Sequence, residues 1–387
     1  MAKRTVRVLS TLIAIGIAVL IILFLSYLGK KSKGPLENIV THAGEAVQKV
    51  EQNIIMEQRE EKRADKLKWF NSYKTDSFLL HNPDRILLGA FDNENKESFE
   101  SSINLEDTLG DPFPLIHIYT AWGSKDEEQF PKLQVKSILE MGSLPVITWE
   151  PWLTDFDSEK IPGLRPVSKR DVGGMSDVAK GKYDSYLHTW AKEAAKINQP
   201  IFIRLGHEMN DPYRYPWGPQ NNTAKDFIAA WQHVYNLFKK DGASKVIWVW
   251  SPHPAYGFFD AFYPGSKYVD YVGIGVLNYG TVASWSKWWT FGEIFGKHYS
   301  ELTVFKKPIM ITEFGSLTAG GKREQWFEEA LHQLPQKYPL IKAILFFHFS
   351  EDNTTTQQVI NWYFINDAKS VHAIKTEIKA WEENNIP

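Results

Sequence analysis

Residues 201–211 read IFIRLGHEMND, a short apolar run that ends in polar and charged residues. Its first part, Ile201 to Leu205, is typical of a buried β-strand because β-branched and large apolar residues dominate it. Seven more runs of this kind occur along the chain, and helix-length segments separate them. The eight runs are Ile86 to Phe91, Leu115 to Tyr119, Leu144 to Trp149, Ile201 to Leu205, Val246 to Trp250, Tyr271 to Val276, Ile309 to Thr312 and Ala343 to Phe347.

The segments between these runs carry helical patterns, among them Lys182 to Lys196, Ala224 to Lys240 and Glu324 to Leu334. Eight strands that alternate with helices are typical of an α/β fold of the (β/α)8 or TIM-barrel type, which needs about 250 residues plus loop insertions. An open, doubly wound sheet is the alternative, but no G-x-G-x-x-G follows the first strand. We therefore predict a (β/α)8 catalytic domain over residues 83–387.

The composition of the 387-residue chain excludes several classes of protein. The chain has 44 Lys and Arg and 46 Asp and Glu, so it lacks the excess of positive charge that a dedicated nucleic-acid binder needs. The chain has no Cys, which excludes disulfide scaffolds, thiolate zinc sites and cysteine nucleophiles. Aromatic residues make up 14 % of the chain, including 15 Trp. Either the core is unusually aromatic or aromatic side chains line a surface cleft. We take the second interpretation as the hypothesis to test.

The N-terminal region predicts a membrane anchor. Val8 to Leu28 is a stretch of 21 residues without a charge, which is long enough for a membrane-spanning helix. A cleaved signal peptide is the alternative, but Ser26 to Gly29 makes a poor cleavage site. Basic residues flank both ends of the stretch, so the positive-inside rule leaves the orientation undecided. We predict an uncleaved anchor with basic flanks over residues 1–33.

Residues 34–82 are predicted to form a helical stalk and linker. A heptad-like stripe of apolar residues runs through Leu36, Val40, Ala43, Val47, Val50 and Ile54. The stripe lasts only about three heptads, and Glu57 and Glu61 end it. A stalk helix that packs on the domain or near the membrane and a weak self-associating coiled coil are both left open by this pattern.

Catalytic residues of such barrels lie at the C-terminal ends of the strands. Acids and rings dominate those ends in this chain, where the residues are Asp92, Thr120 with Trp122, Glu150 with Trp152, His207 with Glu208, Ser251 with His253, Asn278 with Tyr279, Glu313, and His348 with Ser350. Aromatic faces and hydrogen-bonding groups together suit a neutral, polyhydroxylated ligand such as a sugar.

Two of these acids have the positions of a catalytic pair. Alternation along the fourth strand predicts that Arg204 and Glu208 share one face, and the same argument turns Glu313 of the seventh strand inward. Strands four and seven lie across the barrel from each other. Retaining glycoside hydrolysis uses two carboxyl groups about 5 to 5.5 Å apart, one as nucleophile and one as acid and then base. Ordinary strand-end acids in a salt-bridge network are the alternative interpretation of Glu208 and Glu313.

Five motifs together resemble glycoside hydrolase family 26, the family of β-mannanases and some mixed-linkage β-glucanases. They are RLGHEMN at 204–210, YPWG at 215–218, WVWSP at 248–252, YVDYVGI at 268–274 and KPIMITEFG at 307–315. The resemblance extends from about Ile86 to the C-terminus, and it implies that Glu208 is the general acid/base and Glu313 the nucleophile. It also implies that no metal and no organic cofactor takes part. The segment HEMND is not an H-E-x-x-H zinc-binding motif, because Asp211 stands where that motif has its second His.

The predicted substrate-binding residues come from the resemblance and from the rings at the strand ends. They are His207, Arg204, Asn210, Tyr213, Trp217, Trp149, Trp122, Tyr279 and Trp285. The sixth strand departs from the family pattern, in which it ends in Asp with a Tyr two residues later, because this chain has Gly275 and Leu277 there. Tyr279 is predicted to supply the ring from a shifted position.

The sequence therefore predicts a retaining endo-β-glycanase that acts on a β-1,4-mannan or a mixed-linkage β-1,3-1,4-glucan. A polysaccharide substrate predicts that the catalytic domain lies outside a bacterial cytoplasmic membrane, held by a single-pass anchor. The alternative is a non-catalytic glycan-binding partner of a membrane polysaccharide synthase or export complex. The stalk is the predicted surface for weak self-association or for a synthase partner.

Overall fold

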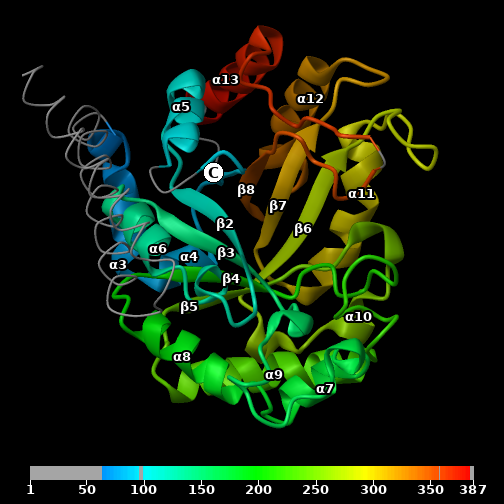
Figure 1. Cartoon of the computed structure of the whole chain (residues 1–387). Helices are drawn as coiled ribbons and strands as arrows, with labels where there is room; N and C mark the ends of the chain where they lie inside the picture. Colours follow the sequence, from blue (N-terminus) through cyan, green and yellow to red (C-terminus); the bar gives the residue numbers. More distant parts are fainter. Residues whose placement is uncertain (1–62, 96–98, 357, 384–387) are drawn as a thin grey trace, which may run out of the picture. The chain divides into compact units, whose positions relative to one another are not determined.

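Eight parallel strands close into a barrel in chain order, and β8 pairs with β1 (Figure 1). The structure is a computed structural model, and it describes residues 63–95, 99–356 and 358–383. The strands are β1 Leu87–Asp92, β2 Leu115–Ala121, β3 Leu144–Glu150, β4 Ile201–Leu205, β5 Val246–Trp250, β6 Tyr271–Asn278, β7 Ile309–Ser316 and β8 Ile341–His348. The predicted (β/α)8 barrel is confirmed, and each predicted strand overlaps an observed one.

Helices lie around the barrel, with α7, α8 and α9 on one side and α12 and α13 on the opposite side (Figure 1). The α-helices are α3 Asn71–Thr75, α4 Ser77–His81, α5 Glu100–Leu109, α6 Lys132–Glu140, α7 Gly174–Ala179, α8 Asp184–Ala195, α9 Ala224–Lys240, α10 Phe259–Phe262, α11 Phe291–Leu302, α12 Arg323–Lys337 and α13 Ala368–Glu383. The 3₁₀ segments are η1 Lys68–Phe70, η2 Asp126–Glu128, η3 Leu153–Asp155, η4 Val167–Lys169, η5 Pro254–Tyr256, η6 Ser266–Tyr268 and η7 Thr303–Phe305.

Helix α9 shows how local sequence specifies these elements. Thr223 caps its N-terminus, since Thr223 Oγ1 accepts the backbone N–H of Asp226 at 3.1 Å and the Asp226 carboxylate accepts the N–H of Thr223 in return. Phe227, Trp231 and Val234 follow at helical spacing and are all buried. Their burial holds α9 against the strands whose ends carry the site residues.

The N-terminal end of the barrel is closed by residues 63–82, which the sequence placed in the stalk. Apolar residues of η1, α3 and α4 form one buried cluster with strand residues, including Leu67, Phe70, Tyr73, Leu80, Leu87, Leu115 and Leu144. Arg63 is also buried and donates two hydrogen bonds to Glu106, at 2.7 and 2.9 Å. These contacts join residues 63–82 to the barrel.

The structure describes no part of the predicted anchor. Among the described residues, no helix is both long enough and apolar enough to cross a membrane. The segment Val8 to Leu28 and the heptad stripe lie in residues 1–62, outside the described part of the chain. The anchor and the stalk therefore stay predictions.

Substitution of Phe70 by Ala tests the packing of the buried cluster that residues 63–82 form with the strands. Phe70 is fully buried, so Phe70→Ala is expected to lower the free energy of unfolding by about 3 to 5 kcal/mol through lost burial and the cavity left behind. Phe78→Ala is the matched control, because Phe78 is 77 % exposed on the neighbouring helix and its loss should change stability by about 0.5 kcal/mol or less. Urea unfolding followed by Trp fluorescence measures both, and equal midpoints for the two variants would contradict the expectation.

Candidate active site

Glu313 of β7 is held by an arginine and a tyrosine from other strands. Arg204 of β4 donates from Nη1 to Glu313 Oε1 at 2.8 Å, and the Tyr119 hydroxyl of β2 donates to the same oxygen at 2.7 Å. Arg204 is fully buried and Glu313 is 8 % exposed. The sequence predicted Arg204 at this site but missed Tyr119, which alternation along strand two would have turned inward.

These partners keep the Glu313 carboxylate ionised. Burial by itself would raise its pKa, but the Arg204 charge and the hydrogen bonds from Tyr119 and Arg204 outweigh burial and hold the pKa below its ordinary value. Burial, aided by Arg204, lowers the pKa of neighbouring His117 to about 3, so this imidazole is neutral at pH 7. Arg204 is therefore the cation that balances the charge of the Glu313 carboxylate.

Glu208 is presented by a turn and not by a strand. Strand β4 ends at Leu205, and Gly206 and Glu208 both have left-handed backbone, with φ of 47° and 53°. The expected alternation from Arg204 to Glu208 is wrong for this reason. The turn is fixed by hydrogen bonds to both neighbouring strands, from Gly206 N–H to Trp149 O at 3.0 Å and from Glu208 N–H to Ser251 O at 2.7 Å. A non-glycine residue in this conformation costs about 1 to 3 kcal/mol and is typical of functional sites.

The surroundings of Glu208 favour its protonated form. Burial raises the pKa of its carboxyl above the ordinary value, and the negative charge of Glu313 adds to that rise. Glu208 Oε2 has no hydrogen-bond partner among the described residues, although Arg214 Nη1 lies 3.8 Å away. Two nearby carboxyl groups thus have pKa values pushed in opposite directions, which is the usual arrangement of an acid and a nucleophile.

Both carboxyl groups border the same small space at Gly275 of β6. A Cβ added at Gly275 would lie 3.7 Å from Glu313 Oε2 and 4.0 Å from Glu208 Oε1. The register of β6 against β7 shifts between Ile274 and Gly275, and such a bulge re-aims the side chains beside it. The common space is compatible with the separation of about 5 to 5.5 Å that retaining glycosidases use.

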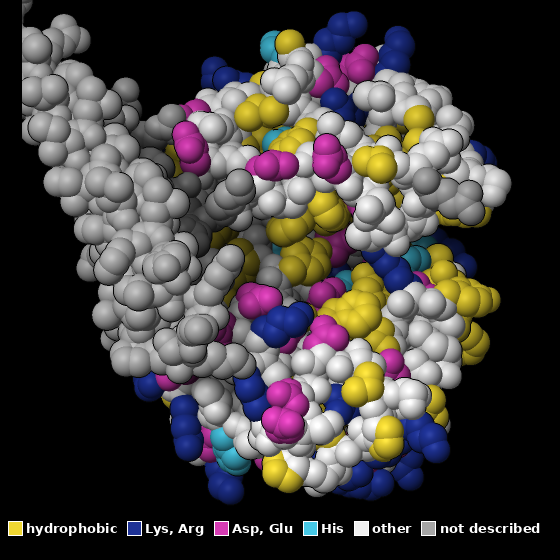
Figure 2. Space-filling view, viewed as in Figure 1, with side chains coloured by type: hydrophobic (Ala, Val, Ile, Leu, Met, Phe, Trp, Pro, Cys, Tyr) yellow, Lys and Arg dark blue, Asp and Glu magenta, His cyan; other side chains and the backbone are white. Residues whose placement is uncertain are grey.

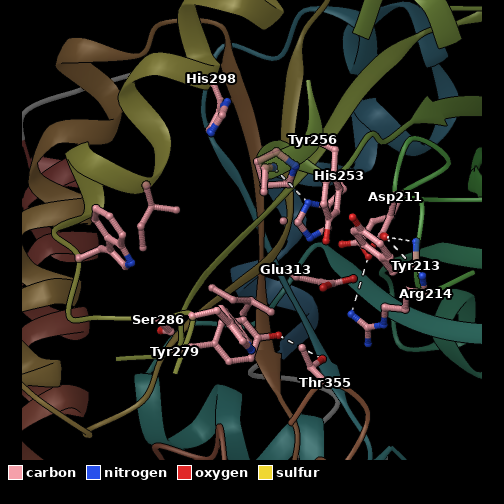
Figure 3. A pocket seen from close by; sticks show the side chains of 18 of the residues that line it. Asp211, Tyr213, Arg214, His253, Tyr256, Tyr279, Ser286, His298, Glu313 and Thr355 are labelled. Atoms are coloured by element: carbon pink, nitrogen blue, oxygen red, sulfur yellow. Dashed lines mark hydrogen bonds and ion pairs between the residues drawn. The ribbon is translucent and has the colours of Figure 1, made fainter. Parts of the chain in front are cut away.

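A cavity of about 840 Å³ opens beside the two glutamates, and Figure 2 shows the hollow in this face of the molecule. Figure 3 shows Glu313 within it, near His253, Tyr213 and Arg214. The lining comes from β6, β7 and α11 and from the loops after β4, β5, β6 and β8. It includes Glu208, Asp211, Tyr213, Arg214, His253, Tyr256, Gly275, Leu277, Tyr279, Trp285, Trp289, Glu313, Thr354 and Thr355. This size suits several sugar units.

Three of the predicted sugar-binding rings line this cavity. Tyr213 is 80 % exposed, Trp285 is 61 % exposed, and Tyr279 packs edge-on against Trp285 with ring centroids 5.1 Å apart. Tyr256 and Trp289 also line it, and the sequence prediction did not include them, because they lie several residues beyond the ends of β5 and β6. Exposed rings with their faces free are what pyranose C–H faces stack on.

Three other predicted rings are packing residues, which corrects the prediction that they contact substrate. Trp149 is fully buried and stacks on Trp190 of α8 at 4.2 Å, and Trp122 packs on Trp149 at 4.7 Å. Strand alternation explains this, because Thr148 and Glu150 of β3 face inward and Trp149 must then face the helices. Trp217 is also buried, and its Nε1 donates to the carbonyl oxygen of His207 at 2.7 Å.

His207 and Asn210 are buried and do not line the cavity. Burial and the Arg204 charge hold the pKa of His207 well below its ordinary value, and its Nε2 lies 3.0 Å from the Tyr215 hydroxyl. Asn210 accepts the backbone N–H of His253 at 2.7 Å and donates to the carbonyl oxygens of His253 and Gly257, both at 2.9 Å. Asn210 therefore ties the loop after β4 to the loop after β5.

One group of described residues has the spacing of metal ligands. Atoms of Glu208, Asp211 and His253 all lie within 4.8 Å of one another. However, His253 Nδ1 accepts the backbone N–H of Ala255 at 3.1 Å, so the neutral ring carries its proton on Nε2. A protonated nitrogen offers no lone pair to a metal ion, and the group does not fit a metal site in this form.

Comparison with known proteins supports the family resemblance. A model described as glycosyl hydrolase family 26 matches residues 173–363, a span that contains Glu208 and Glu313. Endoglucanase H of Acetivibrio thermocellus is 28 % identical over 74 % of this chain, which spans only 30 % of that protein's length. Mannan endo-1,4-beta-mannosidase of Bacillus subtilis is 24 % identical over 73 % of each chain.

The solved structure of a GH26 beta-mannanase from Bacteroides ovatus has the same fold, with a TM-score of 0.56 and 16 % identity over 78 % of this chain and 90 % of that one. The resemblance seen in the sequence motifs is thus confirmed by independent comparisons of sequence and of fold. Residues 173–363 of this chain, which include both glutamates, are therefore similar to glycoside hydrolase family 26.

Proposed function

We propose that this chain is a retaining endo-β-glycanase that hydrolyses a β-1,4-mannan or a mixed-linkage β-1,3-1,4-glucan by double displacement. The observation that carries the proposal is the pair Glu208 and Glu313, two carboxyl groups that border one space and have pKa values shifted in opposite directions. The match to glycoside hydrolase family 26 supports the reaction class, and a glycoside hydrolase is what the sequence predicted.

In the first step Glu313 is the nucleophile. Its ionised carboxylate attacks the anomeric carbon while Glu208 gives its proton to the glycosidic oxygen, so the bond to the leaving sugar breaks and a glycosyl-enzyme ester forms. Arg204 and Tyr119 hold Glu313 Oε1, which leaves Oε2 toward the space at Gly275.

In the second step Glu208 acts as the base. Glu313 has lost its charge in the ester, so the electrostatic effect that raised the pKa of Glu208 disappears and its carboxylate form becomes more stable. Glu208 then takes a proton from water, the resulting nucleophile attacks the anomeric carbon, and the ester bond to Glu313 breaks. Two inversions give net retention of configuration.

The substrate class rests on the relatives and on the cavity. One relative is named an endoglucanase and another a mannan endo-1,4-beta-mannosidase, so a glucan and a mannan are the two substrate classes among the relatives. Exposed Tyr213 and Trp285 beside an uncharged wall at Gly275 and Leu277 suit a neutral polysaccharide.

We also propose that the protein is tethered to the outer face of a bacterial cytoplasmic membrane. The uncharged stretch from Val8 to Leu28 supports a single-pass anchor, and a polysaccharide substrate supports an N-terminus inside the cell. The heptad stripe at 36–54 supports weak self-association or contact with a polysaccharide synthase.

A non-catalytic glycan-binding partner of a membrane synthase is the second candidate. It is favoured by the end of β6, where Gly275 and Leu277 place no polar side chain beside the two glutamates. Reducing-end release from mannan, glucomannan, barley-type β-glucan and β-1,3-xylan separates the two candidates. Cleavage of any one supports the enzyme, whereas binding to the panel without cleavage supports the binding partner.

Substitution of the two glutamates tests the mechanism. Glu313→Gln is expected to lower turnover of an aryl glycoside by about 10³-fold or more, because the amide cannot form the ester. Glu208→Ala should mainly slow substrates with poor leaving groups, and azide should restore turnover with a β-glycosyl azide as product.

Glu150→Gln is the matched control for that experiment, since Glu150 is a third acid at the same end of the barrel and its carboxylate accepts from Trp152 Nε1 at 3.0 Å. Azide should leave its activity unchanged. Full activity of the Glu313 variant, or azide rescue of the Glu150 variant, would contradict the assigned roles.

The pH profile tests the contact between Tyr119 and Glu313. The nucleophile must be ionised, and the Tyr119 hydrogen bond helps to keep its pKa low. Tyr119→Phe removes that bond, so the pKa of Glu313 should rise and the acidic limb of kcat/KM should move to higher pH, with activity lost first at low pH. Tyr256→Phe, a cavity tyrosine remote from this bond, should leave the limb in place. An unmoved limb in the Tyr119 variant would refute this contribution.

A further inference from the structure

A small space beside Glu208 is bordered by three polar side chains, and no side-chain hydrogen bond joins them among the described residues. Atoms of Glu208, Asp211 and His253 lie within 4.8 Å of each other, and all three residues line the cavity. Glu208 is 7 % exposed, and its Oε2 has no hydrogen-bond partner in the described part of the chain. A buried acceptor of this kind requires a partner, and a single oxygen atom can hydrogen-bond to polar atoms that lie up to about 5.5 Å apart.

His253 is held rigidly at the edge of this space. Asn210 binds both its backbone N–H and its carbonyl oxygen, at 2.7 and 2.9 Å, and the ring packs on Tyr256 with centroids 4.7 Å apart. Its Nδ1 accepts from Ala255, so Nε2 is the nitrogen left to bond a ligand, and Figure 3 shows the His253 ring among the side chains that line the cavity. The ring is therefore positioned as a hydrogen-bond donor before any ligand arrives.

The donor and acceptor pattern selects the kind of occupant. His253 Nε2–H requires an acceptor, whereas the Asp211 carboxylate requires a donor. A hydroxyl group satisfies both at once, since its oxygen accepts one hydrogen bond and its hydrogen donates another. Asp211 is itself fixed, because its Oδ1 accepts the backbone N–H of Tyr213 at 2.8 Å.

The position of the space assigns the hydroxyl to one side of the scissile bond. It borders Glu208, the proton donor to the glycosidic oxygen, and Glu313 is not among the three groups that enclose it. We propose that His253 and Asp211 bind a hydroxyl of the leaving sugar, next to the bond that Glu208 protonates. This inference rests on the proposed function, and it makes His253 a determinant of which leaving group the enzyme accepts.

The test compares two substrates that differ in their leaving group. One is a hexasaccharide cut from whichever panel polysaccharide the wild-type chain hydrolyses, and the other is a 4-nitrophenyl β-glycoside, whose leaving group carries no sugar hydroxyl. His253→Ala is expected to lower kcat/KM for the hexasaccharide about tenfold and to leave the aryl glycoside within about twofold of wild type. His253→Gln keeps an N–H donor and should recover part of the loss.

Phe258→Ala is the matched control, because Phe258 lies on the same loop, is 78 % exposed and does not line the cavity. It should leave both substrates unaffected. Equal losses on both substrates in His253→Ala, or no loss on either, overturn the inference while the proposed function stands. Inhibition of the wild-type chain by micromolar Zn²⁺ that His253→Gln abolishes also overturns it, since the space would then be a cation site. A wild-type chain that cuts no polysaccharide overturns the proposed function and this inference with it.

Discussion

The ion pair between Arg204 and Glu313 is the interaction on which the rest of the site depends. A guanidinium with no exposed surface is tolerated inside a protein only when a carboxylate pairs with it, because loss of either partner would leave a buried charge uncompensated. The Tyr119 hydroxyl donates a second hydrogen bond to the Glu313 carboxylate, and His117 stays neutral in the same low-dielectric surroundings. With Glu313 committed to the ionised form, Glu208 is the nearby carboxyl group that can carry the proton which the reaction needs.

The backbone around the two glutamates is irregular where the chemistry requires it. Glu208 has left-handed backbone. Near Glu313, the register of β7 shifts both against β6 and against β8. A regular barrel strand would direct each side chain either into the barrel or toward the helices, whereas these residues must point up to the cavity. Hydrogen bonds from the Glu208 turn to β5 and from Asn210 to the loop after β5 compensate for that strain.

Hydrophobic periodicity was sufficient to predict the barrel, because eight buried strands need eight apolar runs, and β4 and β5 coincide with the predicted bounds. Strand-end positions singled out Glu208 and Glu313, and the family resemblance supplied their roles, whereas the alternation that placed Arg204 and Glu208 on one face is wrong. Strand-end position failed as a criterion for Trp149 and Trp122, since a ring at a strand end can face either the cavity or the helices. Arg214 and Tyr256 could not be predicted, because their place in the cavity depends on loop conformations. The packing of Phe70 against the strands could not be predicted for another reason. Short helices such as α3 and α4 carry little periodic signal.

The high aromatic content has two separate explanations in this fold. Most of the large rings, such as Trp149, Trp190 and Trp231, are buried between the strands and the helices, where they supply apolar area to the domain. The exposed rings gather on the loops after β4 and β6, beside the cavity that contains Glu208 and Glu313. Stacking on these rings is tolerant of sugar identity, because every pyranose has an apolar face. Discrimination between sugars must therefore come from the few fixed polar groups, and the loops after β4 and β5 supply those that lie next to the acid.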